Sequence, residues 1–483
     1  MGKLSSSSAS NSSSSSSTLT IICCIYYMYL FSNFTNVEGF DSLIQLPHSG
    51  GSRHRPRSKK VLYVTDYGAK GHNFNDDTEL PHSGGSRHRP RSKKVLYVTD
   101  YGAKGHNFND DTEALKDVWK VACSLSSRPK IVVPVGHTYL VRPIDFAGPC
   151  RSKITLRISG TIVAPKDPDV WDGLNPRKWL YFHGVNHLTV EGGGIIDGMG
   201  QEWWSQSCKI NKTNVLLAAL TFHRCKNLRI RNLMMVNSQQ MHLAFTSCVR
   251  VAASRLKVLA PGSSPNTDGI HISASTLVEV KESIVRTGDD CISIVGNSSS
   301  IRIRNISCGP GHGISIGSLG KSSSLVEVHN VSVDGAFLSN TENGVRIKTW
   351  QGGSGFATKI AFQNVWMENV SNPIIIDQFY CDSPIPCENQ TLAVKVEDIS
   401  FMAIKGTSAT EQAIKFACSD TFPCESLYLE DIQLDSYSGG STSSFCWEAQ
   451  GSCSGLINPP PCFASDETYI GLKVPSSSVL QSI

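Results

Sequence analysis

The feature of this sequence that most limits its fold is a polar residue that recurs at a fixed interval before a short apolar alternation. Asp268 and Asp290 lie 22 residues apart, and so do Asp290 and His312. Each stands two residues before an Ile-x-Ile pair, and these pairs are Ile270/Ile272, Ile292/Ile294 and Ile314/Ile316. Period-two alternation of branched apolar residues is typical of β-strands. The chain therefore repeats a unit in which one polar position precedes each strand.

The same pattern of short β runs, separated by Gly, Asn, Ser and Asp, extends from about Val95 to Leu472. Examples are residues 154–158, 188–190, 228–230, 277–280, 301–303, 326–328, 331–333, 374–376 and 414–416. The next two intervals, from Ile316 to Ile347 and from Ile347 to Ile376, are 31 and 29 residues and indicate enlarged turns. A sandwich gives no reason for such recurrence, whereas a parallel β-helix requires it, because each coil lays its strand on the one before. We predict an all-β fold, a parallel β-helix.

An exact duplication precedes this region, since residues 46–79 are repeated letter for letter as residues 80–113. After the second copy, Asp110 and Glu113 are placed like a capping pair before an apolar stripe at helical spacing, formed by Ala114, Leu115, Val118, Trp119 and Ala122. The first copy instead runs into Pro81, which ends a helix. We predict one short helix that caps the N-terminal end of the solenoid, because terminal units must shield an open core.

The N-terminus predicts secretion. Lys3 and a serine run precede the apolar stretch Leu19–Phe31, and Val37 and Gly39 occupy the small-residue positions of a cleavage site. The alternative is an uncleaved signal anchor, although the apolar run is short for a membrane span and no later stretch is apolar enough to cross a bilayer.

The predicted organisation has three parts. Residues 1–39 form a signal peptide, residues 40–92 form a poorly ordered linker with the duplicated segment, and residues 93–483 form the parallel β-helix catalytic domain. The basic residues of the linker fit either a solvated segment or an anchor to an acidic polysaccharide.

Cysteine usage agrees with an oxidising compartment. Of 16 cysteines, Cys23 and Cys24 would leave with the signal, so an even number remains. Short disulfide loops are expected among close neighbours, which are Cys291 and Cys308, Cys381 and Cys387, Cys418 and Cys424, and the group Cys446, Cys453 and Cys462. Their connectivity stays open, and the spacing does not suit a zinc site. Six Asn-x-Ser/Thr sequons predict exposed glycosylation sites at Asn211, Asn297, Asn305, Asn330, Asn369 and Asn389.

On a β-helix, residues of one register stack about 4.8 Å apart on consecutive coils. Asp268, Asp290 and His312 would form such a ladder, with Asp289 beside Asp290. Like charges held so close raise at least one pKa, which gives a neutral acid next to an ionised base, the pairing that glycoside hydrolysis needs. A single Asp before a strand is more often a turn former, but a cluster set by an independent period is harder to explain that way. Calcium binding by the carboxylates is a further alternative.

Nearby residues extend this candidate site. Arg346 and Lys348 lie two apart, so they project from the same face of a strand and suit a substrate carboxylate, although a solvated strand face would look the same. Asn266 either contacts substrate or stabilises its turn. Tyr380 and the pair Trp203-Trp204 are candidates for stacking on sugar rings, although aromatic residues more often belong to a core.

Four motifs together carry a family resemblance. Asn266-Thr267-Asp268, Gly288-Asp289-Asp290, Gly311-His312-Gly313 and Arg346-Ile347-Lys348 resemble, in order and spacing, the signature motifs of polygalacturonases, glycoside hydrolase family 28. The wider segments 264–271 and 344–353 resemble the plant members, and the likeness covers about residues 94 to 465. The duplicated segment departs from the family pattern.

The resemblance implies a right-handed parallel β-helix that hydrolyses α-1,4 bonds between galacturonic acid units of pectin with inversion. Asp289 would be the general acid, Asp268 and Asp290 would activate water, and His312 would support the acid. Arg346 and Lys348 would bind the galacturonate carboxylate, with Asn266 and Tyr380 as further substrate contacts. The family needs no metal or cofactor.

The expected partner is therefore the pectic polysaccharide of the cell wall. We expect the protein to be secreted and to act there as a monomer. The net charge of +4 is too weak to indicate nucleic acid, and no membrane partner is expected after signal cleavage. Alternatives are a rhamnogalacturonan hydrolase, a pectate lyase-like enzyme on the same solenoid, and an inactive pectin-binding wall protein.

Overall fold

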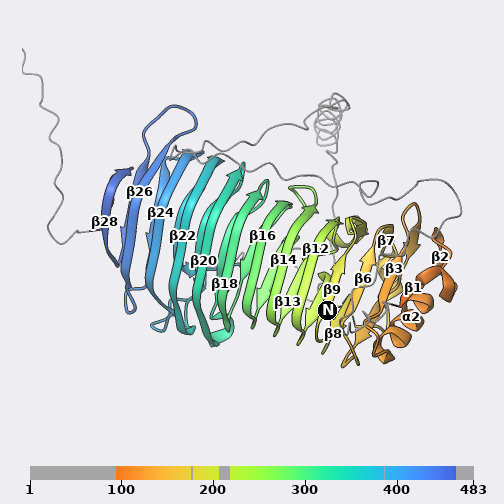
Figure 1. Cartoon of the computed structure of the whole chain (residues 1–483). Coiled ribbons are helices and arrows are strands. Elements are labelled where there is room, and N and C mark those ends of the chain that lie inside the picture. The colour runs from red at the N-terminus through yellow and green to blue at the C-terminus, as the bar shows by residue number, and fades with distance from the viewer. Residues whose placement is uncertain (1–93, 176–177, 206–217, 384, 386, 464–483) are drawn as a thin grey trace, which may run out of the picture. The chain divides into compact units, whose positions relative to one another are not determined.

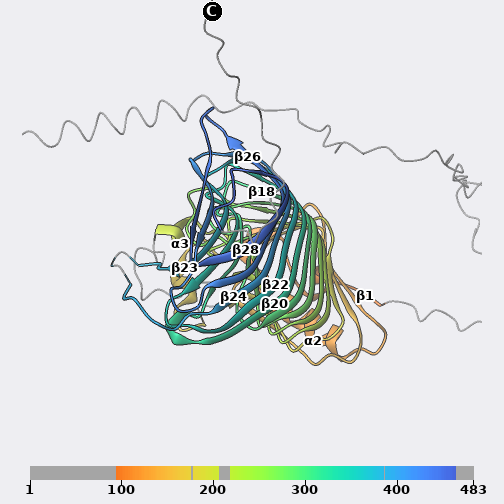
Figure 2. The same cartoon turned by 90° about the vertical axis from the view of Figure 1, so that its left-hand side faces the viewer.

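A computed structural model describes residues 94–175, 178–205, 218–383, 385 and 387–463. These residues form a stack of parallel β coils, with the N-terminal coils beside helix α2 and the C-terminal coils at β28 (Figure 1). The fold is a right-handed parallel β-helix, as the sequence predicts. The view from the C-terminal end shows successive coils lying one behind another (Figure 2).

The strands of the described coils belong to two sheets, and every strand pairs in parallel with one from a neighbouring coil. The 17-stranded sheet, here called sheet A, contains β1 (Val95–Tyr97), β2 (His106–Asp110), β3 (Lys130–Val133), β4 (Thr138–Leu140), β6 (Ile154–Ile158), β7 (Thr161–Val163), β9 (Leu188–Glu191), β10 (Ile195–Asp197), β12 (Lys226–Val236), β14 (Val249–Leu259), β16 (Thr276–Arg286), β18 (Ser298–Cys308), β20 (Leu325–Ser339), β22 (Ser354–Val370), β24 (Lys395–Ser408), β26 (Cys424–Ser436) and β28 (Ala449–Asn458). The 11-stranded sheet, sheet B, contains β5 (Ile144–Ala147), β8 (Lys178–His183), β11 (Ala218–His223), β13 (Leu243–Thr246), β15 (Ile270–Ser273), β17 (Ile292–Ile294), β19 (Ile314–Leu319), β21 (Asn343–Trp350), β23 (Asn372–Tyr380), β25 (Gln412–Ala417) and β27 (Ser443–Trp447).

The recurring interval of the sequence is one coil of sheet B. Ile270 pairs with Ile292, and Ile292 pairs with Ile314. The longer intervals keep the same register, because Ile316 pairs with Ile347 and Ile347 pairs with Ile376. The additional residues of the 31-residue interval are accommodated by the turn η4 (Lys321–Ser323) and the long strand β20.

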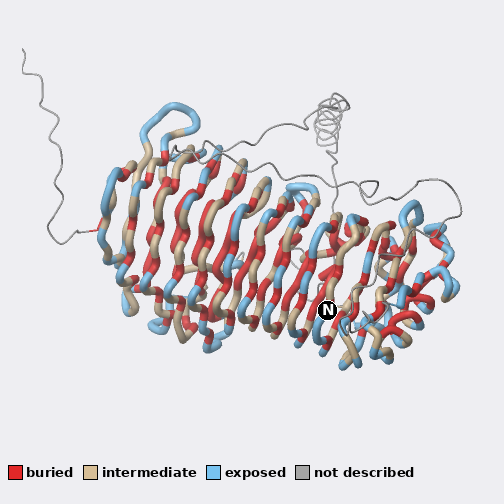
Figure 3. Tube along the Cα trace, in the orientation of Figure 1, coloured by how far each residue is buried: buried red, intermediate tan, exposed pale blue. Residues whose placement is uncertain are grey.

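The interior of the coils is filled by ladders of identical or similar side chains. Buried and exposed positions alternate along most strands, as Figure 3 shows by colour. Phe182 stacks on Phe222 and Phe222 on Phe245, with ring centroids 5.1 and 5.8 Å apart. Burial of apolar side chains in register with like side chains is the main favourable term that holds coil on coil.

Helix α2 (Thr112–Ser124) covers the first coils and confirms the predicted cap. All five residues of the predicted apolar stripe are buried. Trp119 meets Phe146 and Phe182 edge to face, at 5.2 and 5.5 Å, and its Nε1–H donates to the carbonyl of Ala147 at 3.0 Å. The helix therefore closes the apolar interior that the first coil would otherwise expose.

The predicted capping pair is wrong in detail. The N-cap is Asp111, and its carboxylate accepts the backbone N–H of Lys104 and Gly105 instead of capping the helix. Asp110 accepts the N–H of Thr112, while Glu113 pairs with Lys116. The N-terminal carboxylates tie the helix to the preceding loop, so the helix start is fixed by tertiary contacts.

The sequence reasoning also missed a second helix, α3 (Gln201–Ser205), which carries the tryptophan pair. Trp203 is buried edge to face against Trp171, at 5.2 Å. Trp204 donates its Nε1–H to the carbonyl of Ser238 at 3.0 Å. Packing, and not sugar stacking, accounts for Trp203.

Five disulfides are formed among the described residues. The three short pairs expected from proximity are confirmed, and Cys446 bonds to Cys462; the full set is Cys123–Cys150, Cys291–Cys308, Cys381–Cys387, Cys418–Cys424 and Cys446–Cys462. Cys225, Cys248 and Cys453 are free thiols. Of the described sequon residues, Asn369 is half-buried and the others are exposed: Asn297, Asn305, Asn330 and Asn389.

Several sequence predictions lie outside the described residues. They are the signal peptide at 1–39, the linker at 40–92 and the sequon at Asn211. Within the described part of the chain, no helix is long and apolar enough to cross a membrane.

The role of the helical cap gives a stability prediction. Replacing Trp119 with alanine removes a buried aromatic side chain that seals the first coils, so the free energy of unfolding should fall by about 3–5 kcal/mol. Urea denaturation followed by tryptophan fluorescence and circular dichroism measures the change. Lys120→Ala, an exposed change on the same helix, should stay within about 0.5 kcal/mol; an equal loss in both variants would contradict a sealing role for Trp119.

Candidate active site

The predicted polar ladder is present at the entry to three neighbouring strands of sheet B. Asp268, Asp290 and His312 each lie two residues before a strand, β15, β17 and β19 respectively. Backbone hydrogen bonds lock the coils at this level: Gly269 N–H donates to Asp290 O at 2.9 Å, and Cys291 N–H donates to Gly313 O at 2.8 Å. The three residues therefore share one register on consecutive coils.

Two motif glycines allow the coils to approach this closely. A Cβ atom on Gly288 would lie 2.0 Å from the carbonyl oxygen of Ser264. A Cβ on Gly313, which has a φ of +83°, would lie 2.1 Å from the carbonyl oxygen of Asn343. A side chain at either position would force neighbouring coils apart, so glycine is required beside the polar residues.

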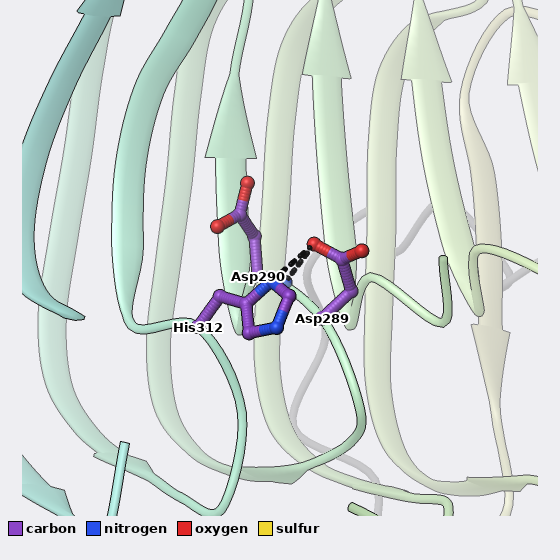
Figure 4. Close-up of side chains that lie close together, drawn as sticks. All are labelled: Asp289, Asp290 and His312. Atoms are coloured by element: carbon purple, nitrogen blue, oxygen red, sulfur yellow. Dashed lines mark hydrogen bonds and ion pairs between the residues drawn. The ribbon is translucent and has the colours of Figure 1, made fainter. Parts of the chain in front are cut away.

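Asp289 lies one residue off the ladder and contacts His312. Its Oδ1 is 3.0 Å from Nδ1 of His312 and accepts the backbone N–H of Asp290 at 2.8 Å. Figure 4 shows the imidazole of His312 turned toward the Asp289 carboxylate, with the Asp290 side chain beside both. One carboxylate oxygen of Asp289, one of Asp290 and one ring nitrogen of His312 all lie within 4.8 Å of one another.

Asp290 is held by two cations from the coil of β21. Arg346 Nη2 donates to one carboxylate oxygen at 2.8 Å and Lys348 Nζ donates to the other at 2.9 Å. Ser315 Oγ donates to the first oxygen at 2.7 Å and accepts a hydrogen bond from Nε of Arg346 at 3.0 Å. Arg346 and Lys348 are only 8% and 6% exposed, so they are not part of a solvated strand face.

Asp268 is a buried carboxylate with a polar partner on the next coil. Ser293 Oγ donates to its Oδ2 at 2.7 Å, and Nδ1 of His271 lies 3.7 Å from the same oxygen. Burial raises the pKa of Asp268, and the charges of Asp289 and Asp290 raise it further, against a smaller opposing effect of His271. Asp268 is thus a carboxylate whose ionised form is costly in this structure.

His312 lies between two carboxylates. Its Nδ1 faces Asp289, and its Nε2 lies 3.3 Å from Oε2 of Glu342. Burial opposes the imidazolium form, but the hydrogen bond to Asp289 and the charges of Asp289, Glu342 and Asp290 outweigh it and raise the pKa of His312. The residue is poised to carry a positive charge next to Asp289.

The other two predicted site residues flank this cluster. The ring of Tyr380 lies 5.4 Å from Nζ of Lys348 and meets Trp350 edge to face at 5.3 Å. Burial raises the pKa of Tyr380, so its hydroxyl stays protonated and can donate. Asn266 precedes the ladder by two residues and has a left-handed backbone, with a φ of 55°, a conformation that asparagine tolerates.

Comparisons with known proteins agree with this geometry. Residues 123–455 match the family model for glycosyl hydrolases family 28. The chain is 57% identical over 445 residues to a probable polygalacturonase of Arabidopsis thaliana, covering 91% of this chain and 93% of that protein. The chain belongs to glycosyl hydrolases family 28. It is therefore a glycoside hydrolase.

Further comparisons extend this result. The chain is 49% identical over 336 residues to a polygalacturonase of Persea americana, covering 69% of this chain and 72% of that protein. The crystal structure of an exopolygalacturonase from Thermotoga maritima matches the fold with a TM-score of 0.64 at 20% identity, covering 76% of this chain and 92% of that one. The solved structure therefore supports the β-helix fold on which the four motifs are placed.

Sequence reasoning missed four polar residues of the candidate site. Ser293 and Ser315 occupy the middle of the Ile-x-Ile pairs, 22 residues apart, so the interval that revealed the carboxylates also marks the hydroxyls that hold them. His271 sits at the same place one coil earlier. Glu342 gave no such signal, because it comes from the 31-residue interval, outside the regular period.

The charge balance of the candidate site bears on the calcium alternative. Both oxygens of Asp290 already meet a cation, and Oδ1 of Asp289 meets His312. A divalent ion placed among Asp289, Asp290 and His312 would lie against the positive charges of Arg346 and Lys348, and the imidazole donor would have to leave its carboxylate. The donor set therefore disfavours calcium.

The contact between Glu342 and His312 gives a pKa prediction. Glu342→Gln removes one of the negative charges that favour the imidazolium, so the pKa of His312 should fall. Histidine resonances followed by NMR through a pH titration measure it. Glu327→Gln, which removes an exposed carboxylate on β20, is the control; a His312 pKa that responds equally to both changes would show that the Glu342 contact is unimportant.

The buried Asp268 carboxylate gives a stability prediction with a defined pH dependence. Because the pKa of Asp268 is raised in the folded protein, its ionisation costs stability above the unfolded value of about 3.9. Asp268→Asn should therefore raise the free energy of unfolding at pH 7 by about 1 kcal/mol. The gain should shrink as the pH falls and disappear below the unfolded value.

Denaturation at pH 7 and at acid pH tests this. Asp398→Asn, at an exposed residue with a left-handed backbone, should change stability by less than about 0.5 kcal/mol at either pH. Destabilisation by Asp268→Asn at pH 7 would mean that the carboxylate is a net structural support.

Proposed function

We propose that this chain hydrolyses α-1,4 bonds between galacturonosyl units of pectin, in its de-esterified polygalacturonate form, with inversion at the anomeric carbon. The observation that carries the proposal is the joint placement of Asp289, Asp290 and His312, with Asp268 one coil away. The protein relatives of this family 28 chain are named polygalacturonases, in agreement with the proposal. Paired carboxylates beside the cations Arg346 and Lys348 suit an acidic glycan.

Asp289 is the proposed general acid. Its proton passes to the glycosidic oxygen as the bond from that oxygen to the anomeric carbon breaks, leaving Asp289 ionised. The imidazolium of His312, 3.0 Å away, stabilises the carboxylate as it forms. Glu342 in turn favours the charged state of His312.

Asp268 and Asp290 are proposed to act together as the general base. They take a proton from the water that attacks the anomeric carbon from the opposite face of the sugar, which inverts its configuration. The raised pKa of Asp268 makes it the stronger base once ionised, since a base is most effective when its pKa approaches the working pH. Arg346 and Lys348 stabilise Asp290 as a carboxylate, so it orients the water.

Arg346 and Lys348 are also proposed to bind the substrate carboxylate. Lys348 has three donor hydrogens, and among the described residues its one carboxylate partner is Asp290, so it can bridge Asp290 and a galacturonate. The ring of Tyr380 borders the same ammonium group, and its hydroxyl is placed to contact the sugar. Asn266 is proposed as a further hydrogen-bonding contact.

We further propose that the chain is secreted and acts in the cell wall as a monomer. The five disulfides support an oxidising compartment. All eight proposed site residues come from one chain, so the chemistry needs no second copy. The mechanism assigns no step to a metal or cofactor, and the proposed partner is the pectic chain, not a nucleic acid or a membrane.

The proposal predicts the effect of removing the acid. Asp289→Asn keeps the shape of the side chain but cannot supply the proton, so release of reducing sugar from polygalacturonate should fall by a factor of about 10² to 10⁴. Asp398→Asn should retain full activity.

Product analysis separates the remaining alternatives. An absence of reducing-sugar release by the wild-type protein would refute enzymatic hydrolysis and favour a pectin-binding role. Unsaturated products that absorb in the ultraviolet would indicate a lyase instead.

A further inference from the structure

A second polar feature lies away from the candidate active site, on sheet A. A groove of about 470 Å³ crosses the beginnings of the neighbouring strands β6, β9, β12 and β14, which lie side by side in Figure 1. The proposed active-site residues belong to later coils and lie in sheet B strands or in the turns before them, so this groove is a separate site.

The groove is lined by basic side chains from successive coils. Five of its lining residues are basic and exposed, and none of the described residues that line it is acidic; the five are Arg128, Lys153, His187, Arg229 and Arg250. Among the described residues, none of the five has a carboxylate within ion-pair distance. Arg250 donates to the side chain of Asn227 at 3.1 Å, which leaves its charge uncompensated.

Other arginines on sheet A form ion pairs with carboxylates. Arg231 pairs with Glu191 and Arg255 with Glu282. Arg304 pairs with Glu279 two coils further on. Sheet A therefore carries ion-paired arginines outside the groove and unpaired positive charges inside it. A concave surface with unpaired positive charges raises the local concentration of anions.

The spacing of these charges suits a linear polyanion. Coils of a β-helix repeat at about 4.8 Å, so basic residues on consecutive coils form a row along the solenoid axis. Arg229 and Arg250 stand on adjacent coils, because β12 pairs with β14. A chain with one carboxylate on every sugar can place successive charges along this row, whereas a neutral glycan gains nothing from it.

We propose that this basic groove is a non-catalytic binding site for an acidic polysaccharide, a run of de-esterified galacturonan. The choice of polymer rests on the proposed function, since the same polyanion would be cut at the active site. The groove holds one segment of the polymer while the active site on other coils cleaves another, and this keeps the enzyme on its substrate. Contacts with exposed charges make the binding sensitive to salt.

The double variant Arg229→Gln/Arg250→Asn tests the groove. A matched control is Arg302→Gln/Lys359→Asn, which removes the same charge from the same two registers on later coils. Arg302 follows the register of Arg229 through Ala252 and Glu279. Lys359 has a left-handed backbone like Arg250, with φ values of 54° and 60°, so asparagine suits both positions.

Two readouts keep the groove distinct from catalysis. The dissociation constant for long polygalacturonate, measured at low salt by affinity electrophoresis in the Asp289→Asn background, should rise about fivefold in the groove variant and not in the control. The difference should vanish at high salt. With otherwise wild-type protein, kcat and KM for trigalacturonate, too short to span both sites, should be unchanged.

Three results would overturn the proposal. Equal affinity of the groove variant and the control for polygalacturonate is the first. An equal loss of binding to DNA and to polygalacturonate would show a general polyanion surface and contradict the assignment to galacturonan. Loss of trigalacturonate cleavage in the groove variant would show that the groove belongs to the active site. If the wild-type protein cleaves nothing, the proposed function fails, but the affinity comparison still decides the groove.

Discussion

The structure depends on one constraint, the parallel register between successive coils of sheet B. The backbone hydrogen bonds between β15, β17, β19 and β21 fix which residues share a level. Because the isoleucine ladder is fully buried, a slip of one residue would turn every apolar side chain outward. The same register therefore sets the core and places Asp268, Asp290 and His312 on one edge, so the stability of the fold is what holds the candidate active site together.

Such a placement is electrostatically unfavourable by itself, and neighbouring coils supply the compensation. Three carboxylates lie together in a largely buried cluster, where like charges repel strongly. Arg346 and Lys348 neutralise the charge of Asp290. Ser293 donates a hydrogen bond to Asp268, and Ser315 donates one to Asp290. His312, when protonated, stabilises the ionised form of Asp289. Asp268 is left with a raised pKa. At Asp268 the proposed catalytic role therefore lowers the stability of the fold. At Asp290 the contacts with the two cations serve both the proposed role and the stability.

The period of the sequence made much of this predictable. A 22-residue interval between Ile-x-Ile pairs predicted the strands, their register and the polar ladder, because a solenoid repeats both core and edge positions. The apolar stripe from Ala114 to Ala122 predicted the capping helix, because apolar residues at helical spacing indicate a helix with one buried face. Motif resemblance added the roles of Asp289 and of the cations, which the interval alone does not assign.

Other features depend on contacts between coils that no local pattern encodes. The binding of Arg346 and Lys348 to Asp290 joins residues 56 and 58 positions apart. From their spacing on one strand face, the sequence predicted only a substrate carboxylate or solvent as their surroundings. Asp111 rather than Asp110 became the helix N-cap because the preceding loop supplies the N–H groups for its carboxylate. The basic groove arises only when five successive coils stack, since its residues are scattered from Arg128, just before β3, to Ala252 in β14.

The central claim is that Asp289 protonates the leaving group while Asp268 and Asp290 direct water to the opposite face of the sugar. The most direct measurement is a ¹H NMR time course of oligogalacturonate cleavage that identifies the anomer of the new reducing end before it mutarotates. Inversion at an α linkage predicts that the β anomer appears first and the α anomer grows in later. An α anomer at the earliest times would mean retention, and it would contradict the account.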